Sequence, residues 1–294
     1  MDRKICLITG ANSGIGKAAC VQMLQKGYSV VMACRNEKRG RQALEDVIKQ
    51  SGSNAAELLI LDMSLQSSIK RAAQQYMAKY DTLDVLISNA AAFDMSQKEL
   101  VKTPEGIESI WATNHLGPVL LVDELLEPLK KSGQGRIITV ASQGLVMHPL
   151  LKVDIMDPEF EKRHFSVAKA YYQSKLAQVM YTYWLAEKLK DTGITVNCIR
   201  VTNVRVDVSR YPNISKAAKL AYSIKSKKSI APEKMAETYV WLATAPELNT
   251  TTGKYFGHHN DNVNSSPYSR DEQQITALME RTYEYFKQRR NEVV

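Results

Sequence analysis

Cysteine is scarce in this sequence, with four residues in 294, and no two of them form a C-x-x-C pair. This spacing gives no dithiol redox motif and no zinc-ribbon site, and so few cysteines exclude a small disulfide scaffold. The four residues are Cys6, Cys20, Cys34 and Cys198. We expect them to be reduced, buried thiols of a cytoplasmic protein.

Long apolar runs are missing as well. The first run, Ile5–Ile8, is too short for the core of a signal peptide. No later run approaches the roughly 20 apolar residues that a membrane-spanning helix needs. We therefore expect a soluble protein without a transmembrane segment.

Histidine is also rare, with five residues. His258 and His259 are adjacent and lie near Asp261, but side-by-side histidines lack the spacing of a metal-ligand set. We therefore expect no metal.

The net charge of +8 raises the question of nucleic acid. The chain has no arginine-rich run and no basic stripe interleaved with aromatic residues, so we expect no nucleic-acid partner. Much of the excess comes from the segment 216–228, which holds five lysines and no acidic residue. Apolar residues interleave with these lysines, which predicts an amphipathic basic helix.

Short apolar runs alternate along the chain with longer segments of helical spacing. We predict strands at Ile5–Thr9, Tyr28–Cys34, Ala56–Leu61, Leu83–Ser88, Arg136–Ala141, Gly193–Arg200 and Gly253–Gly257. We predict helices at Lys17–Gln25, Lys38–Lys49, Ser67–Lys79, Ser166–Lys190, Pro232–Thr244 and Arg270–Arg290. Near-continuous apolar strands that alternate with helices indicate a doubly wound parallel β-sheet of the α/β class, flanked by helices on both faces. No low-complexity linker divides the chain, so we expect a single domain over residues 1–294.

Two irregular stretches, near 145–164 and 202–229, each follow a predicted strand. In open parallel sheets, ligands bind in the crevice beyond the carboxyl ends of the strands. We therefore expect these two stretches to form the walls of a substrate site.

The first predicted strand leads into Thr9–Gly16, which reads TGANSGIG and precedes a helix. Glycine permits a positive φ, and a helix N-terminus attracts phosphate. A glycine-rich turn without a ligand is the alternative, but a position between the first strand and the first helix favours the pyrophosphate of a dinucleotide. The residues expected to hold it are Gly10, Asn12, Ser13, Gly14, Ile15 and Gly16. The predicted sheet is therefore of the Rossmann type.

The end of the second predicted strand bears on the choice of cofactor. In NAD enzymes an acidic residue near this point binds the ribose 2′-hydroxyl. Here Arg35 and Asn36 follow the strand instead, and a guanidinium suits a 2′-phosphate. We infer NADP(H), with Arg35 and Asn36 in contact with it; a solvated, basic helix start is the alternative.

Two further strand ends add to the expected cofactor site. The third predicted strand runs into Asp62 and Met63, where a carboxylate can accept a hydrogen bond from the adenine amino group. The fourth is followed by Asn89 and Ala90, in a run of small residues that lets the backbone pass close to a cofactor.

Tyr171 and Lys175 lie four residues apart in the predicted helix 166–190, and therefore on one face. An ammonium near a tyrosine favours the phenolate and lowers the pKa of the phenol, which suits proton transfer to or from a substrate oxygen. Ser142, at the end of the fifth predicted strand, can hold that oxygen. Asn114, in a helix before that strand, can anchor a water that links Lys175 to solvent.

The same spacing recurs at Tyr283 and Lys287 in the predicted C-terminal helix. That helix lies far along the chain from every cofactor signal. We interpret this second pair as a chance pair on the surface.

With these motifs the chain resembles the classical short-chain dehydrogenase/reductase family over about Lys4–Phe256. The motifs that carry the resemblance are the glycine turn, Asp62, the Asn89 segment, Asn114, Ser142 and the pair Tyr171 and Lys175. The resemblance implies that Tyr171 is the acid/base and that Lys175 binds the nicotinamide ribose and tunes Tyr171. It also implies that Ser142 orients the carbonyl and that Asn114 supports a proton relay.

Within the family the chain is most similar to the retinol dehydrogenase and protochlorophyllide reductase-like branch, for example in the runs 33–36 and 114–117. This branch implies NADP and a bulky apolar aldehyde, ketone or alcohol as substrate. The resemblance also implies a substrate lid around 216–228. A solvated lid face and a lid that makes peripheral contact with an anionic membrane are alternatives, and so are a monomer and a homo-oligomer.

The sequence departs from the family on the nicotinamide side. Val201 and Thr202 stand where the family has Pro-Gly, and Val206 stands where a threonine usually meets the nicotinamide carboxamide. These changes favour, as an alternative, an NADP-binding sensor or scaffold with little turnover. The branch itself offers a second alternative, the reduction of a C=C bond.

Overall fold

Residues 3–205 and 229–288 of the chain are described by a computed structural model. Val206 and the basic segment predicted as a helix over 216–228 lie outside the described residues.

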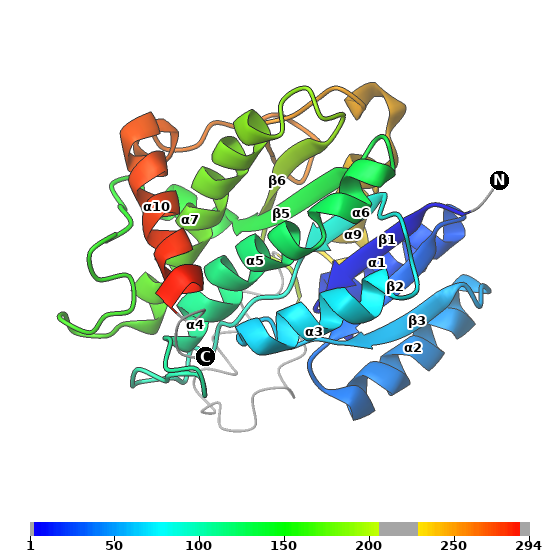
Figure 1. Cartoon of the computed structure of the whole chain (residues 1–294), viewed down its shortest axis with the longest axis horizontal. Helices are drawn as coiled ribbons and strands as arrows, with labels where there is room; N and C mark the ends of the chain where they lie inside the picture. Colours follow the sequence, from blue (N-terminus) through cyan, green and yellow to red (C-terminus); the bar gives the residue numbers. More distant parts are fainter. Residues whose placement is uncertain (1–2, 206–228, 289–294) are drawn as a thin grey trace.

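The described chain contains a seven-stranded sheet with every neighbouring pair parallel, in the order β3-β2-β1-β4-β5-β6-β7 (Figure 1). The strands are β1 Ile5–Thr9, β2 Ser29–Cys34, β3 Ala56–Ile60, β4 Val85–Ser88, β5 Arg136–Ser142, β6 Thr195–Val201 and β7 Lys254–Phe256. The chain winds outward from β1 to β3 and then crosses to β4 on the other side of β1, so a crevice opens beyond the carboxyl ends of β1 and β4. The predicted doubly wound, Rossmann-type sheet is confirmed.

The alternation of side chains along the strands divides the core into two layers. In β1, Ile5 and Leu7 belong to one buried cluster, whereas Cys6 and Ile8 belong to the cluster on the opposite face. Both faces are apolar because both are covered, as expected for a parallel sheet. Each fully buried leucine or isoleucine contributes about 1.5–3 kcal/mol relative to exposure.

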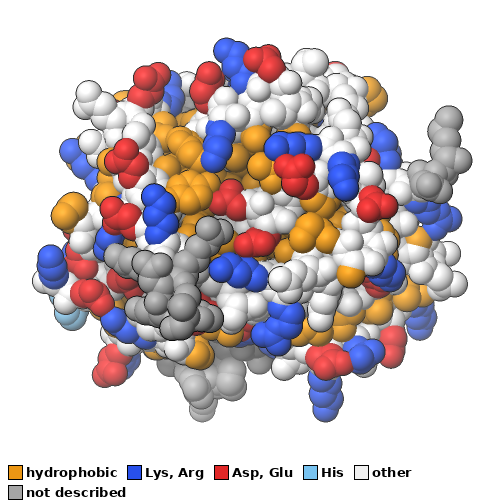
Figure 2. All heavy atoms as spheres, viewed as in Figure 1, with side chains coloured by type: hydrophobic (Ala, Val, Ile, Leu, Met, Phe, Trp, Pro, Cys, Tyr) orange, Lys and Arg blue, Asp and Glu red, His pale blue; other side chains and the backbone are white. Residues whose placement is uncertain are grey.

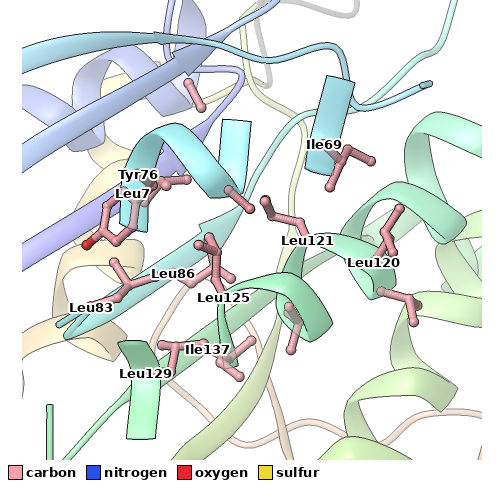
Figure 3. Packing of buried hydrophobic residues seen from close by; sticks show 14 of the residues in the cluster. Leu7, Ile69, Tyr76, Leu83, Leu86, Leu120, Leu121, Leu125, Leu129 and Ile137 are labelled. Atoms are coloured by element: carbon pink, nitrogen blue, oxygen red, sulfur yellow. The ribbon is translucent and has the colours of Figure 1, made fainter. Parts of the chain in front are cut away.

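The helices cover the two faces of the sheet. Their bounds are α1 Gly14–Gln25, α2 Glu37–Ser51, α3 Gln66–Met77, α4 Ser109–Trp111, η1 Ala112–Leu116, α5 Gly117–Glu124, α6 Leu126–Lys131, η2 Gln143–Met147, α7 Val167–Lys188, α9 Pro232–Thr244, η4 Pro246–Leu248, η5 Tyr268–Arg270 and α10 Glu272–Gln288. Helices α1, α2 and α9 pack on one face. Helices α3, α5, α6 and α7 pack on the other, where leucines dominate the cluster (Figure 3).

Helix α10 lies outside this second layer and packs against α7 (Figure 1). The prediction that Tyr283 lies on the surface was wrong. The Tyr283 ring is half-buried against Trp184, and its hydroxyl donates to Asp123 Oδ1 at 3.1 Å. The hydrophobic stripe of α10 requires this packing, because an amphipathic helix buries its apolar face.

On the face of the described residues that Figure 2 shows, the surface charge is mixed. On the face in Figure 2, basic and acidic side chains are interspersed between apolar ones. All four cysteines are buried and free, as predicted from their number and spacing.

Candidate active site

The glycine turn joins β1 to α1 at the crevice. Gly10 has φ +66° and Gly14 has φ +55°, so both use the left-handed region that glycine enters without strain. A Cβ on Gly16 would lie 2.6 Å from the carbonyl oxygen of Gly10, so only glycine fits there. A Cβ on Gly14 would meet nothing within 4 Å. This open side of the turn gives a ligand direct access to the backbone.

The start of α1 is suited to an anion. Ser13 is the N-cap residue, but its side chain makes no capping hydrogen bond, and the first turn carries no acidic residue. The first N–H groups of a helix have no partner within the helix and carry a partial positive charge. Asn12, Ser13 and Ile15 are all partly exposed beside these groups.

Asn89 and Thr9 hold the glycine turn in place. The Asn89 side-chain amide donates to the Thr9 carbonyl at 2.9 Å, and its oxygen accepts from the Tyr239 hydroxyl at 3.2 Å. The Ala90 N–H donates to Thr9 Oγ1 at 2.9 Å. The polar groups of Asn89 are thus engaged within the protein, and its contribution to a cofactor site is the shape of the turn.

Arg35 lies beside the crevice with its side chain 69% exposed, and its Nε is 3.9 Å from Asp62 Oδ2. Asn36 caps α2 by accepting from the Arg39 N–H at 2.9 Å. Asp62 Oδ1 accepts from the N–H of Ser64 at 2.9 Å, which shapes the turn after β3. Arg35 is therefore the side chain of this group that is available to an incoming phosphate.

Met63 belongs to the core rather than to the crevice. Its side chain is buried in the leucine-rich cluster. Its carbonyl oxygen packs so closely on α5 that a Cβ on Gly117 would lie 2.2 Å away. Any contribution of Met63 to a cofactor site is limited to its backbone.

Helix α7 carries both Tyr171 and Lys175. Lys175 is 2% exposed, and its Nζ donates to the Val140 carbonyl at 2.9 Å and lies 5.7 Å from the centre of the Tyr171 ring. Burial lowers the pKa of Lys175 to about 8. The ammonium is therefore the main form at neutral pH, close to the Tyr171 ring.

Asn114 lies in the π-helical turn η1 between α4 and α5, where the wider turn alters which backbone groups are paired. Its side chain accepts from the Ala92 N–H at 2.6 Å and donates to Ser174 Oγ at 3.0 Å. Ser174 in turn donates to the Tyr171 carbonyl at 2.7 Å. These bonds join the start of the loop after β4, the π-turn η1 and the part of α7 that carries Tyr171.

Sequence reasoning did not identify Ser174. It lies directly before Lys175 and is fully buried. The sequence shows only a serine next to Lys175 in a helix. Its bond with Asn114 becomes apparent only from the packing of α7 on η1.

Ser142 ends β5, and its hydroxyl accepts from the Gly144 N–H at 3.1 Å. Tyr172 packs over Gly144 so closely that a Cβ there would lie 2.3 Å from the ring. Gly144 thus lets the chain turn away after Ser142 while Tyr172 stays in contact.

Aromatic rings surround Tyr171. Phe93, from the loop after β4, stacks on it with ring centres 4.2 Å apart. Tyr172 lies edge-on to it at 5.3 Å and is itself 4.5 Å from His148. Sequence reasoning did not identify Phe93, because a residue in an irregular loop gives no spacing signal.

Apolar side chains are exposed on the two loops that follow β4 and β5. Met147, Leu150 and Met156 are 78%, 91% and 80% exposed. Val146 and, on the other loop, Met95 are exposed as well. The loops that follow β4 and β5 therefore expose several large apolar side chains at the end of the sheet where the crevice opens.

His258 and His259 lie with ring centres 3.9 Å apart. Within residues 3–205 and 229–288, no three His, Cys, Asp or Glu side chains gather in a way that could hold a metal ion. No helix in these ranges is both long and apolar enough to cross a membrane.

Comparison with known proteins identifies the family. A family model for short chain dehydrogenases matches residues 4–151. Retinol dehydrogenase 14 of Homo sapiens is 34% identical over 271 residues, covering 87% of this chain and 79% of that protein. Retinol dehydrogenase 12 of Homo sapiens is 34% identical over 253 residues, covering 86% and 77%. The chain belongs to the short-chain dehydrogenase family of oxidoreductases, in its retinol dehydrogenase-like branch.

Solved structures show the same fold. A protein from Mycobacterium paratuberculosis superposes with a TM-score of 0.72 at 24% identity, covering 97% of this chain and 93% of that one. A short chain dehydrogenase from Shigella flexneri, complexed with NADP, superposes with a TM-score of 0.64 at 23% identity, covering 88% and 98%.

Proposed function

We propose that this protein transfers hydride between NADP(H) and a carbonyl or alcohol group of a bulky apolar substrate, with Tyr171 as the acid/base. The observation that carries the proposal is the position of Lys175. Its buried ammonium is bonded to β5 two residues before Ser142 and lies 5.7 Å from the Tyr171 ring. A buried cation beside a phenol stabilises the phenolate, which is the form left after the proton has gone to the substrate oxygen.

The described residues fit a dinucleotide phosphate. The N-terminus of α1 has no side-chain cap, and the turn at Gly14 is open to a ligand. Gly10, Asn12, Ser13, Ile15 and Gly16 would shape the backbone around the pyrophosphate, which a helix N-terminus stabilises. The backbone of Met63 and Ala90 and the turn held by Asn89 would border the cofactor.

Arg35 supports NADP over NAD. Its exposed guanidinium follows the end of β2, with Asn36 next to it and Asp62 in the turn after the neighbouring strand β3. A guanidinium binds a 2′-phosphate through charge-assisted hydrogen bonds. The likeness to a dehydrogenase complexed with NADP agrees with this choice.

The bound nicotinamide would supply or accept the hydride. In carbonyl reduction, Tyr171 would donate its phenolic proton to the substrate oxygen while Ser142 donates a second hydrogen bond to that oxygen. Lys175 would stabilise the Tyr171 phenolate. Asn114, in the π-turn η1, would support the proton relay that returns a proton to Tyr171 after each turnover.

The site walls support an apolar substrate. Phe93 and Tyr172 flank Tyr171, and the exposed apolar side chains of 146–156 lie on the loop that follows Ser142. Relatives named retinol dehydrogenase agree with a large apolar alcohol or aldehyde.

The test is NADPH oxidation, followed by absorbance, with a panel of apolar aldehydes and ketones. We expect turnover that is much weaker with NADH and that falls by about 10²- to 10⁴-fold in Tyr171→Phe, the range of general acid catalysis. NADPH binding without turnover on any substrate would overturn the proposal in favour of a cofactor-binding sensor. A product saturated at a C=C bond would instead identify a conjugated-bond reductase.

A further inference from the structure

Residues 148–164, which follow η2, are the wall segment of the proposed substrate site. A side chain of α7 holds this segment in place. Gln173, two residues after Tyr171, is 2% exposed. Its side-chain oxygen accepts from the Asp154 N–H at 3.1 Å and from Arg163 Nη2 at 2.8 Å. Its amide donates to the Pro158 carbonyl at 2.9 Å. Helix α7, which carries Tyr171, is therefore bonded to the wall segment at three positions, Asp154, Pro158 and Arg163.

A second attachment comes from a different direction. Glu159, next to Pro158, accepts from the Glu108 N–H at 2.7 Å with one carboxylate oxygen. With the other oxygen it accepts from the Tyr285 hydroxyl of α10 at 2.7 Å. Glu108 caps α4, since its carboxylate accepts from the N–H of Trp111 at 2.7 Å. One carboxylate thus joins the wall segment, the start of the helix that leads to Asn114, and α10.

We propose that Tyr285 is a positioning residue for substrate recognition: through Glu159 it fixes the wall segment 148–164 against the helix that carries Asn114. This inference rests on the proposed function. Tyr285 is buried and Glu159 is half-buried, so the hydroxyl bond to the carboxylate is partly shielded from water, which strengthens a charge-assisted bond. Without it, the Glu159 carboxylate keeps one hydrogen bond among the described residues, that from the Glu108 N–H. The wall segment then loses its attachment to α10 and becomes free to shift on that side.

A purely structural role of Tyr285 predicts a different outcome from a role in substrate recognition. If Tyr285 only attached α10 to the rest of the protein, its loss would lower stability and leave substrate binding unchanged. The same helix offers a matched control in Tyr283, whose hydroxyl also donates to a half-buried carboxylate, that of Asp123 on α5. Within the described residues, Asp123 makes no hydrogen bond with the wall segment, and burial raises its pKa to about 6.

The experiment compares Tyr285→Phe with Tyr283→Phe in the full-length protein. Each change removes one phenol hydroxyl and keeps the ring. We expect both to lower the melting temperature, because each loses one buried hydrogen bond. Only Tyr285→Phe should raise KM for a bulky apolar aldehyde, by about three- to tenfold, a fraction of what a bond to a charged group is worth. KM for a small aldehyde and the Kd for NADPH should stay unchanged.

Amide hydrogen exchange gives a readout that needs no turnover. Exchange within 153–163 should become faster in Tyr285→Phe and stay as in the wild type in Tyr283→Phe. Equal exchange, or an equal change of KM, in the two variants would overturn the inference. If the wild type reduced no carbonyl, the proposed function would fail, and the exchange comparison alone would still decide whether Tyr285 fixes the wall.

Discussion

The Lys175 ammonium donates a hydrogen bond to the main-chain oxygen of Val140 at 2.9 Å. Val140 lies in β5, two residues before Ser142. The bond therefore fixes α7, and with it Tyr171, against the carboxyl end of the strand that carries Ser142. A buried charge held by one neutral carbonyl is weakly stabilised, and burial accordingly lowers the pKa of Lys175 to about 8.

This pKa predicts how carbonyl reduction depends on pH. Below pH 8 Lys175 is charged and can stabilise the Tyr171 phenolate, whereas above pH 8 the neutral amine cannot. We expect kcat/KM for reduction, which reports groups of the free enzyme, to fall as pH rises through about 8. Arginine stays charged in this pH range, so the remaining kcat/KM of Lys175→Arg should not decrease as pH rises through about 8. A profile that stays level from neutral pH to well above the pKa of Lys175 would contradict the role of the ammonium.

Arg35 leads to a prediction about cofactor choice. Replacing Arg35 with serine removes the guanidinium that we propose for the 2′-phosphate. A bond to a charged group is worth about 1.5–3 kcal/mol, so the Kd for NADPH should rise about 10- to 100-fold while the Kd for NADH changes little. Cofactor titration by fluorescence measures both.

The matched control for Arg35 is Arg41→Ser. Arg41 already pairs with Glu37 at 2.5 Å on the exposed side of α2. Its removal should change NADPH affinity far less. Equal effects in the two variants would contradict a specific contact of Arg35 with the 2′-phosphate and favour the alternative from the sequence, a solvated, basic helix start.

The sequence predicted the strands and most helices because each gives a local signal. β1 and α9 occupy the predicted residues at both ends, since an unbroken apolar run and a proline in the first helical turn mark their limits. The glycine turn was equally local, and Gly10 and Gly14 have the positive φ that glycine permits. Periodicity and turn chemistry act over a few residues and can be identified without the fold.

The contacts that shape the proposed site were not local. Glu159 and Tyr285 are 126 residues apart, and Asn114 and Ser174 are 60 apart. No spacing rule links such partners, because the packing of α7 on the sheet and of α10 on α7 brings them together. For the same reason Tyr283 was wrongly expected on the surface.

His115, next to Asn114, leads to a prediction about stability. Its ring is fully buried, and Nε2 lies 2.8 Å from Thr282 Oγ1. The Thr282 hydroxyl donates to the Leu278 carbonyl, so it accepts from His115, which carries a proton on Nε2. Burial lowers the pKa of His115 to about 3.

The sign of the effect follows from this low pKa. Between the ordinary histidine pKa of about 6.5 and the folded value of about 3, the unfolded chain binds a proton that the native state does not. The His115 contribution to the free energy of unfolding is therefore complete above pH 6.5 and falls by about 1.4 kcal/mol per pH unit below it.

Urea unfolding at several pH values between 7 and 4 tests this in His115→Gln, which keeps a polar side chain but cannot titrate. The variant should be less stable than the wild type at neutral pH, because a buried ring and its bond to Thr282 are lost. Its free energy of unfolding should fall less steeply as pH decreases, because unfolding of the variant takes up about one proton fewer than unfolding of the wild type. The same steepness in His115→Gln would mean that other groups cause the acid sensitivity.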